Sequence, residues 1–164
     1  MNFLQPENDP QGSGYNVIQS TIAVGSGGMT GKGIGHGSQS QLNFLPENHT
    51  DFIFAVIAEE SGFAGAIFVL LLFCILMYRI KKAAQSANDN FGYLLAVGIM
   101  IMFFVQILIN IGMNIGIMPV TGIPLPLLSY GGSSLVTVFI SLGIVVNIYL
   151  KREKNADLNV TQSY

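Results

Sequence analysis

Three long apolar runs dominate the chain after its first fifty residues. They cover residues 52–79, 91–113 and 133–150, and Glu59 and Glu60 interrupt the first of them. Each run approaches the roughly 20 residues that a helix needs to cross about 30 Å of hydrocarbon. The pattern therefore predicts an all-α membrane protein, with three transmembrane helices and a short tail in residues 51–164.

Residues 1–50 have a different pattern, rich in Gly, Ser, Asn and Gln. Their one short apolar stretch, Val17 to Val24, has no clear periodicity and could form a short helix at the membrane surface. The run from Gly25 to Gly37 holds so many glycines that we expect a loop whose backbone can approach a ligand closely. We interpret residues 1–50 as a long Gly-rich external loop region.

Composition and charge agree with a membrane protein. The sequence is 51% hydrophobic and only 10% charged, which is too apolar for an ordinary soluble domain. Six of the seven basic residues lie in segments 79–82 and 151–154, and Lys32 is the exception. The positive-inside rule makes those segments cytoplasmic, so residues 1–50 and about 114–132 are expected outside. The net charge of −2 indicates no nucleic-acid partner.

The polar start of the chain lacks the pattern of a cleavable signal peptide, although residues 1–50 are expected outside. We interpret this conflict as a sign of a fragment of a larger polytopic protein, whose upstream helices would export the segment. The single cysteine, Cys74, lies inside the first apolar run and is expected to pack as a small apolar residue.

Asp51 lies where the polar loop meets the first apolar run. Placing an unpaired carboxylate in hydrocarbon costs about 2.5 kcal/mol or more. A carboxylate is therefore unexpected in a helix that only anchors the protein, and Asp51 is a functional candidate. Thr50 or Asp51 is a natural N-cap, and capping alone could explain the carboxylate. A general base instead needs a carboxylate oxygen that can reach a substrate proton.

Glu59 and Glu60 would lie roughly 12 to 14 Å beyond Asp51 along a straight helix. Such acids are protonated, paired with a base, or directed into a polar cavity, and each case needs a surface that faces protein or water. The three expected helices offer no partner at that level. We therefore expect the partner on a neighbouring helix outside this sequence.

Asn110 and Asn114 are four residues apart on one face of the second helix, and Gly112 and Gly116 permit close approach. This arrangement favours an interhelical hydrogen-bonded contact. Three prolines in segment 119–134 exclude a continuous helix before Gly131.

Several side chains are candidates for ligand binding. Lys32, together with loop amides, could hold an anionic head group, although a solvated lysine explains it equally well. Glu47, His49 and Asp51 could bind a hard divalent cation, Mg²⁺ or Mn²⁺, but their spacing matches no defined metal motif. Ser129 and Tyr130 offer hydroxyl groups near the outer interface, where a tyrosine is usually an anchor.

Four strings together resemble one family. They are GSGG at 25–28, GKG at 31–33, QSQLNFLPENHTDFIFAVIAEE at 39–60 and PLPLLSYGGSS at 124–134. They resemble the RodA branch of the SEDS family, which also includes FtsW. The resemblance covers nearly the whole chain and implies the C-terminal part of a larger SEDS fold.

The resemblance implies a peptidoglycan glycosyltransferase of the bacterial inner membrane, with a role in cell shape or division. Its substrate would be the lipid-linked precursor lipid II, and its partner a class B penicillin-binding protein. The family's essential loop aspartate falls in HTDF, which places the general base at Asp51. Family members often have arginine between the Glu and His of this motif, where this chain has Asn48; the motif stays intact, but a local cationic contact is not expected from it. The substrate-binding residues implied are Lys32, Gln39, Gln41, His49, Thr50, Glu59, Glu60, Ser129 and Tyr130.

Two alternatives remain open on the sequence. A precursor flippase or transporter would use Glu59 and Glu60 to line a polar path, with Asp51 recognising a head group. A non-catalytic fragment would only dock with a partner protein. We expect the isolated chain to be inactive in either the polymerase or the docking case.

Overall fold

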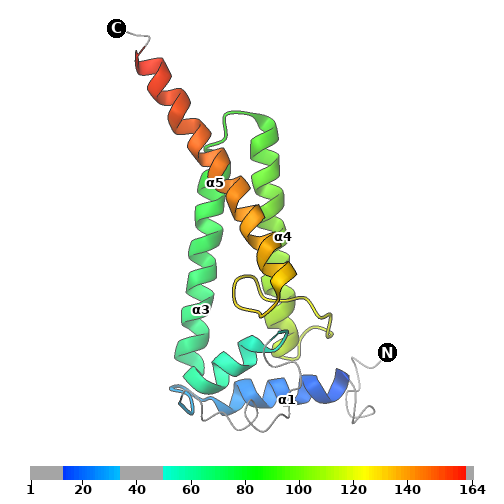
Figure 1. Ribbon diagram of the computed structural model, residues 1–164. Coiled ribbons are helices and arrows are strands. Elements are labelled where there is room, and N and C mark those ends of the chain that lie inside the picture. Colours follow the sequence, from blue (N-terminus) through cyan, green and yellow to red (C-terminus); the bar gives the residue numbers. More distant parts are fainter. Residues whose placement is uncertain (1–12, 34–49, 162–164) are drawn as a thin grey trace. The chain divides into compact units, whose positions relative to one another are not determined.

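The computed structural model describes residues 13–33 and 50–161. Helices there are α1 (Ser13–Ser26), α3 (Ile53–Gln85), α4 (Asn90–Asn114) and α5 (Gly132–Thr161), and these ranges contain no strand (Figure 1). Three segments are long and apolar enough to cross a membrane, namely α3, α4 and Gly132–Lys151 of α5. The prediction of an all-α membrane protein with three spanning helices is confirmed.

The described residues divide into two compact units. One contains α1, the start of α3 up to Leu71, the end of α4 from Gln106, and the connection to Gly131. The other contains α3 from Leu72, α4 up to Val105, and α5. The candidate site lies within the first unit.

Helix α1 includes the short apolar stretch whose periodicity was unclear and extends beyond it at both ends. Its hydroxyl side chains bond back to carbonyl groups one turn earlier, Ser20 and Thr21 to Val17 and Ser26 to Ala23. Such bonds let polar residues lie in a helix that also buries an apolar face. That face includes Ala23, which is fully buried against Phe52 and Ala55 of the α3 region.

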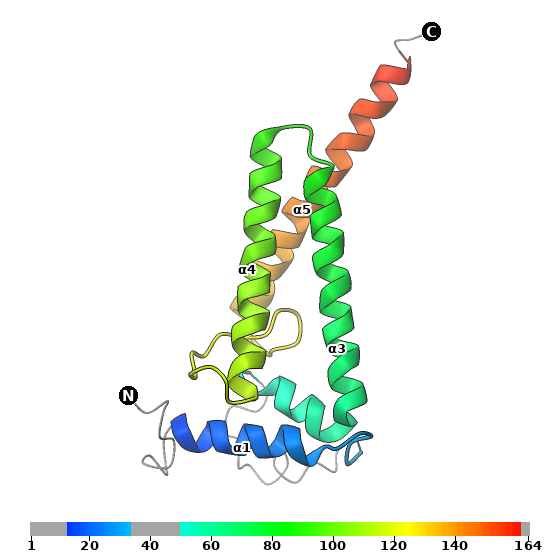
Figure 2. The ribbon, with the colours of Figure 1, turned by 180° about the vertical axis from the view of Figure 1, so that it is seen from behind.

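Helix α3 breaks at Gly62, where φ is 68° and ψ is −162°. Only glycine adopts this backbone conformation readily, because a Cβ atom makes it strained. Figures 1 and 2 show the segment before Gly62 running beside α1 and turning sharply into the next part of α3. The break follows Glu59 and Glu60, so both acids lie in the short first segment of α3 and their expected position along that helix stays a prediction.

The break leaves backbone groups without helical partners, and residues 27–33 supply those partners. We call these residues the glycine turn. Phe63 and Ala64 donate N–H groups to the carbonyls of Gly28 and Met29, at 2.8 and 3.3 Å. The N–H groups of Lys32 and Gly33 bond to the carbonyls of Glu59 and Glu60, both at 3.0 Å.

Gly27 and Gly31 allow this contact because the two backbones nearly touch. A Cβ atom at Gly27 would overlap the carbonyl oxygen of Ala58, and one at Gly31 would overlap that of Glu60. The glycines were expected to bring the backbone close to a ligand. In the glycine turn they bring it close to α3, and the approach to a ligand stays a prediction.

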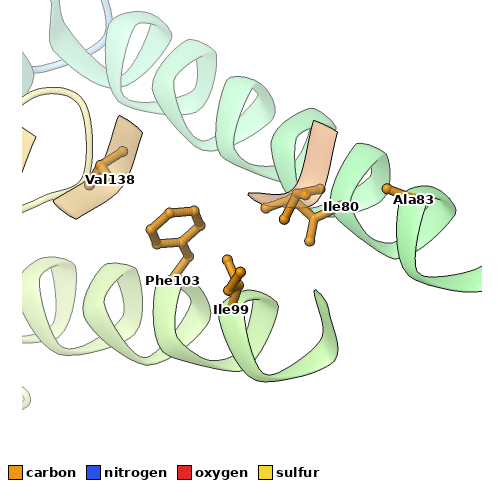
Figure 3. Close-up of a cluster of buried hydrophobic side chains, with 6 residues drawn as sticks. Ile80, Ala83, Ile99, Phe103 and Val138 are labelled. Carbon is orange, nitrogen blue, oxygen red and sulfur yellow. The ribbon is translucent and has the colours of Figure 1, made fainter. Parts of the chain in front are cut away.

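The second unit has an ordinary apolar core. Figure 3 shows Phe103 and Ile99 of α4 directed toward Ile80 of α3 and Val138 of α5. Phe103 is fully buried, whereas Phe104 and Phe139 are more than half exposed. Exposed aromatic side chains on these helices suit faces that meet lipid.

The proline-rich connection from Ile115 to Gly131 contains no helix, and α5 begins at Gly132, as the prolines predicted. Helices α3 and α5 continue past their apolar runs through Lys82 and Lys151.

We predict that Gly27→Ala releases the glycine turn, because overpacking typically costs about 1–3 kcal/mol. Trypsin cleavage after Lys32 in the detergent-purified chain should accelerate about tenfold, since cleavage follows the population of the open form. Gly25→Ala is the matched control, because a Cβ there meets nothing within 4 Å. Equal cleavage rates for both variants would contradict the packing assigned to Gly27.

Candidate functional site

Asp51 lies in the turn formed by Thr50, Asp51 and Phe52, and its side chain is partly buried. Helix α3 begins at Ile53, so Phe52 stands between the helix and Asp51, the nearer of the two residues predicted to cap it. The N–H of Ala55 bonds to the carbonyl of Phe52 at 3.0 Å and to Oδ1 of Asn114 at 3.2 Å. Part of the cap of α3 therefore comes from the end of α4.

Two fully buried asparagines hold the backbone at Asp51. Nδ2 of Asn110 donates to the carbonyl oxygen of Asp51 at 2.9 Å and to that of Ile123 at 2.9 Å. Nδ2 of Asn114 donates to the same Asp51 oxygen at 3.1 Å and to the carbonyl of Asn110 at 2.8 Å. The predicted hydrogen-bonded contact of this pair is confirmed, and its target is the turn before α3.

The glycines near this pair also allow close contacts. A Cβ atom at Gly112 would lie 3.0 Å from the Met118 side chain, and one at Gly116 would lie 3.1 Å from Oγ1 of Thr21 in α1. Gly116 has a positive φ of 77°, which a side chain would strain. The end of α4 is thereby packed against both the following loop and α1.

Ser129 fixes the same turn from the proline-rich connection. Its Oγ donates to the carbonyl oxygen of Thr50 at 2.6 Å and accepts from the N–H of Leu125 at 2.7 Å. Its side chain is buried, whereas Tyr130 next to it is 81% exposed. Gly122 of this connection approaches the carboxylate, because a Cβ atom there would lie 3.5 Å from Oδ2 of Asp51.

Lys32 and Glu59 form an ion pair, with Nζ and Oε1 2.8 Å apart. The Glu59 side chain is fully buried, and that of Lys32 is 30% exposed. The partner of Glu59 was expected on a helix outside this sequence, and that expectation is wrong for this residue. The base comes from the glycine turn, which packs against the end of the short first segment of α3.

Gln39, Gln41, Glu47 and His49 lie outside the described residues. Within the described ranges, no group of three or more His, Cys, Asp or Glu side chains could hold a metal ion. Because Glu47 and His49 are not covered, the predicted divalent cation site stays a prediction. Glu60 is partly buried, and its carbonyl accepts the N–H of Gly33.

The sequence reasoning did not connect Asn110, Asn114 or Gly122 with Asp51. A signal for the asparagines existed, since two amides on one face of an apolar helix must find partners when buried. It could not identify the partner, because the contacts join residues about sixty positions apart.

Comparison with known proteins identifies the family. A family model described as "Cell cycle protein", of the FtsW/RodA/SpoVE type, matches residues 1–154. The peptidoglycan glycosyltransferase MrdB of Escherichia coli K12 is 53% identical over 153 residues, which cover 93% of this chain and 41% of MrdB. Stage V sporulation protein E of Bacillus subtilis is 49% identical, covering 89% of this chain and 40% of that protein. This chain thus spans about 40% of the length of these relatives.

Two solved structures are also similar. One chain, from work on the structural coordination of polymerization and crosslinking by a peptidoglycan synthase complex, has a TM-score of 0.72 and 38% identity. The match covers 92% of this chain and 40% of that one. An Asp-to-Ala mutant of the Thermus thermophilus rod shape determining protein RodA has a TM-score of 0.61 and 40% identity. It covers 65% of this chain and 36% of that protein.

The family match extends over residues 1–154, which is nearly all of the sequence. This chain belongs to the FtsW/RodA/SpoVE family.

Proposed function

We propose that this chain contributes the general base, Asp51, to a peptidoglycan glycosyltransferase. The observation that carries the proposal is the fixed turn around Asp51. Three buried polar side chains, Asn110, Asn114 and Ser129, bond to the carbonyl oxygens of Asp51 and Thr50. A catalytic carboxylate must be held in a productive position, and fixing its backbone achieves this.

The relatives support the reaction class, since MrdB of Escherichia coli and RodA of Treponema pallidum are both named peptidoglycan glycosyltransferases. In the proposed reaction, a sugar hydroxyl of one lipid II unit attacks the anomeric carbon of another. Asp51 takes the hydroxyl proton as the new glycosidic bond forms. The bond from the anomeric carbon to the phosphate oxygen breaks, and polyprenyl pyrophosphate leaves with the electron pair.

One carboxylate is enough for this displacement. Pyrophosphate is a good leaving group that needs no carboxylic acid to protonate it, so the paired acids of glycosidases are not required. Its charge does need stabilisation, which Lys32, a divalent cation or loop amides would provide. General-base catalysis of this kind typically contributes 10²- to 10⁴-fold.

We further propose that the chain has a RodA-type role in the bacterial inner membrane, with the Asp51 turn on the external side. Its proposed partner is a class B penicillin-binding protein. The similar chain from the peptidoglycan synthase complex supports a partner that crosslinks the strand. The basic residues at 79–82 and 151–154 support an external position for the Asp51 turn.

Asp51→Asn should reduce polymerisation of fluorescent lipid II at least about 100-fold, because the amide cannot accept the proton. The assay uses a chimera in which this chain replaces the matching region of Escherichia coli MrdB, together with the partner penicillin-binding protein. Asp89→Asn is the matched control, since Asp89 accepts the N–H of Gly92 at 3.3 Å and asparagine caps equally well. Undiminished polymer from Asp51→Asn would refute the general-base role.

Asn114→Ala should lower kcat of the same chimera about tenfold or more while leaving lipid II binding nearly unchanged. The substitution removes a donor to the Asp51 carbonyl and leaves the Ala55 N–H without its side-chain acceptor, a loss of about 1–3 kcal/mol. Asn147→Ala removes an exposed asparagine of α5 and serves as the control. An unchanged kcat for Asn114→Ala would show that catalysis does not depend on the hydrogen bond from Asn114 to the Asp51 carbonyl.

Lys32→Gln should destabilise the chain, because it leaves the buried Glu59 carboxylate without this cation. The double variant Lys32→Gln with Glu59→Gln should regain thermal stability, since the buried charge is gone. If Lys32 also stabilises pyrophosphate, the folded double variant still polymerises poorly in the chimera. Full recovery of both stability and polymerisation would limit Lys32 to a structural role.

A further inference from the structure

A cavity of about 280 Å³ lies in the second unit, between the end of α3 and α5. Its polar lining comes from Arg79, Lys82 and Tyr149. The rest of its lining is apolar and consists of Ile80, Ala83, Leu142, Val145 and Val146. None of these residues belongs to the Asp51 site, which lies in the other unit.

The cations of this cavity come from one side of α3. Arg79 and Lys82 are three residues apart, so they lie on neighbouring positions of the helix surface. Lys81 lies between them in sequence, is exposed, and does not line the cavity. The last carbonyl groups of α3 favour positive charge at this helix end.

A second cavity in the same unit provides a contrast. It is larger, about 430 Å³, and lies between the start of α4 and α5. Its charged lining residues are Asp89 and Lys151, whose formal charges cancel. The smaller cavity has two cationic residues and no acidic residue in its lining. The net positive charge of its lining therefore makes the smaller cavity, and not the larger one, the candidate site for an anionic ligand.

We propose that the cavity between α3 and α5 binds an anionic glycerophospholipid. The phosphate group is held by Arg79 and Lys82, with the Tyr149 hydroxyl as a further donor. An acyl chain lies along Leu142 and Val146, of which Val146 is more than half exposed. The apolar wall distinguishes a lipid from a free phosphate, which would gain nothing from it. Basic pockets between membrane helices bind such head groups on the cytoplasmic side.

The test uses tryptophan fluorescence, because the chain contains no tryptophan. Tyr149→Trp places one at the cavity and keeps an aromatic ring with a hydrogen-bond donor. The purified chain is reconstituted in phosphatidylcholine vesicles that contain a small fraction of phosphatidylglycerol. Quenching by brominated phosphatidylglycerol is compared with quenching by brominated phosphatidylcholine, which gives the relative affinity of the site for the anionic lipid.

We expect phosphatidylglycerol to be preferred over phosphatidylcholine at least tenfold. Arg79→Gln and Lys82→Gln, each made in the Tyr149→Trp chain, should each reduce this preference about fivefold. Lys81→Gln removes the same charge from the same turn of α3 and should leave the preference nearly unchanged. Arg79→Lys keeps the charge and should retain most of it.

Two results would overturn the proposal. Equal losses for Lys81→Gln and Lys82→Gln would show diffuse attraction to a charged surface rather than a site. Equal quenching by the two brominated lipids in the Tyr149→Trp chain would show that no selective lipid occupies the cavity. Quenching by brominated phosphatidylcholine in every variant verifies that the tryptophan still faces lipid. The substitutions should not unfold the chain, because Arg79, Lys81 and Lys82 are all exposed.

Discussion

The break of α3 at Gly62 exposes backbone amide and carbonyl groups, and the first unit is organised around satisfying them. Unpaired backbone groups are costly wherever water is excluded, so a broken helix in a membrane protein needs partners from elsewhere in the protein. The glycine turn donates to the carbonyls of Glu59 and Glu60 and accepts from Phe63 and Ala64. This reciprocal bonding explains why the turn must come within backbone contact of α3, which Gly27 and Gly31 permit.

The opposite end of the short first segment of α3 is satisfied in a similar way. There the amide of Asn114 bonds to both the Asp51 carbonyl and the Ala55 N–H. Side chains from α4 and from the proline-rich connection meet at this end, while the glycine turn meets the other. The segment is therefore held at both ends, and Asp51 and Lys32 have defined places relative to it. The buried charge of Glu59 is tolerated because Lys32 lies 2.8 Å away.

The second unit follows simpler physics. Its helices bury small clusters around Phe103 and expose large apolar side chains toward the surroundings. The charged residues that line its two cavities lie near the end of α3, just before α4 and near the end of the apolar run of α5, where a membrane protein meets the head groups. The turn proposed to carry the catalytic base lies in the first unit, and the cavity proposed to bind a lipid lies in the second.

The sequence by itself determined the class of fold, because the length and hydrophobicity of an apolar run decide whether a helix can cross a membrane. It also determined the end of helical structure before Pro119 and the start of α5, since proline cannot donate to a helix. It selected Asp51 and recognised that Asn110 and Asn114 must be bonded. Only the tertiary structure decided that α3 breaks at Gly62, that Lys32 neutralises Glu59, and that the asparagines hold the Asp51 turn. An apolar run that contains a glycine has the same pattern as a continuous helix, so the break at Gly62 could not be predicted from it. Contacts between distant residues depend on how the backbone folds back on itself, and a local sequence pattern does not contain that information.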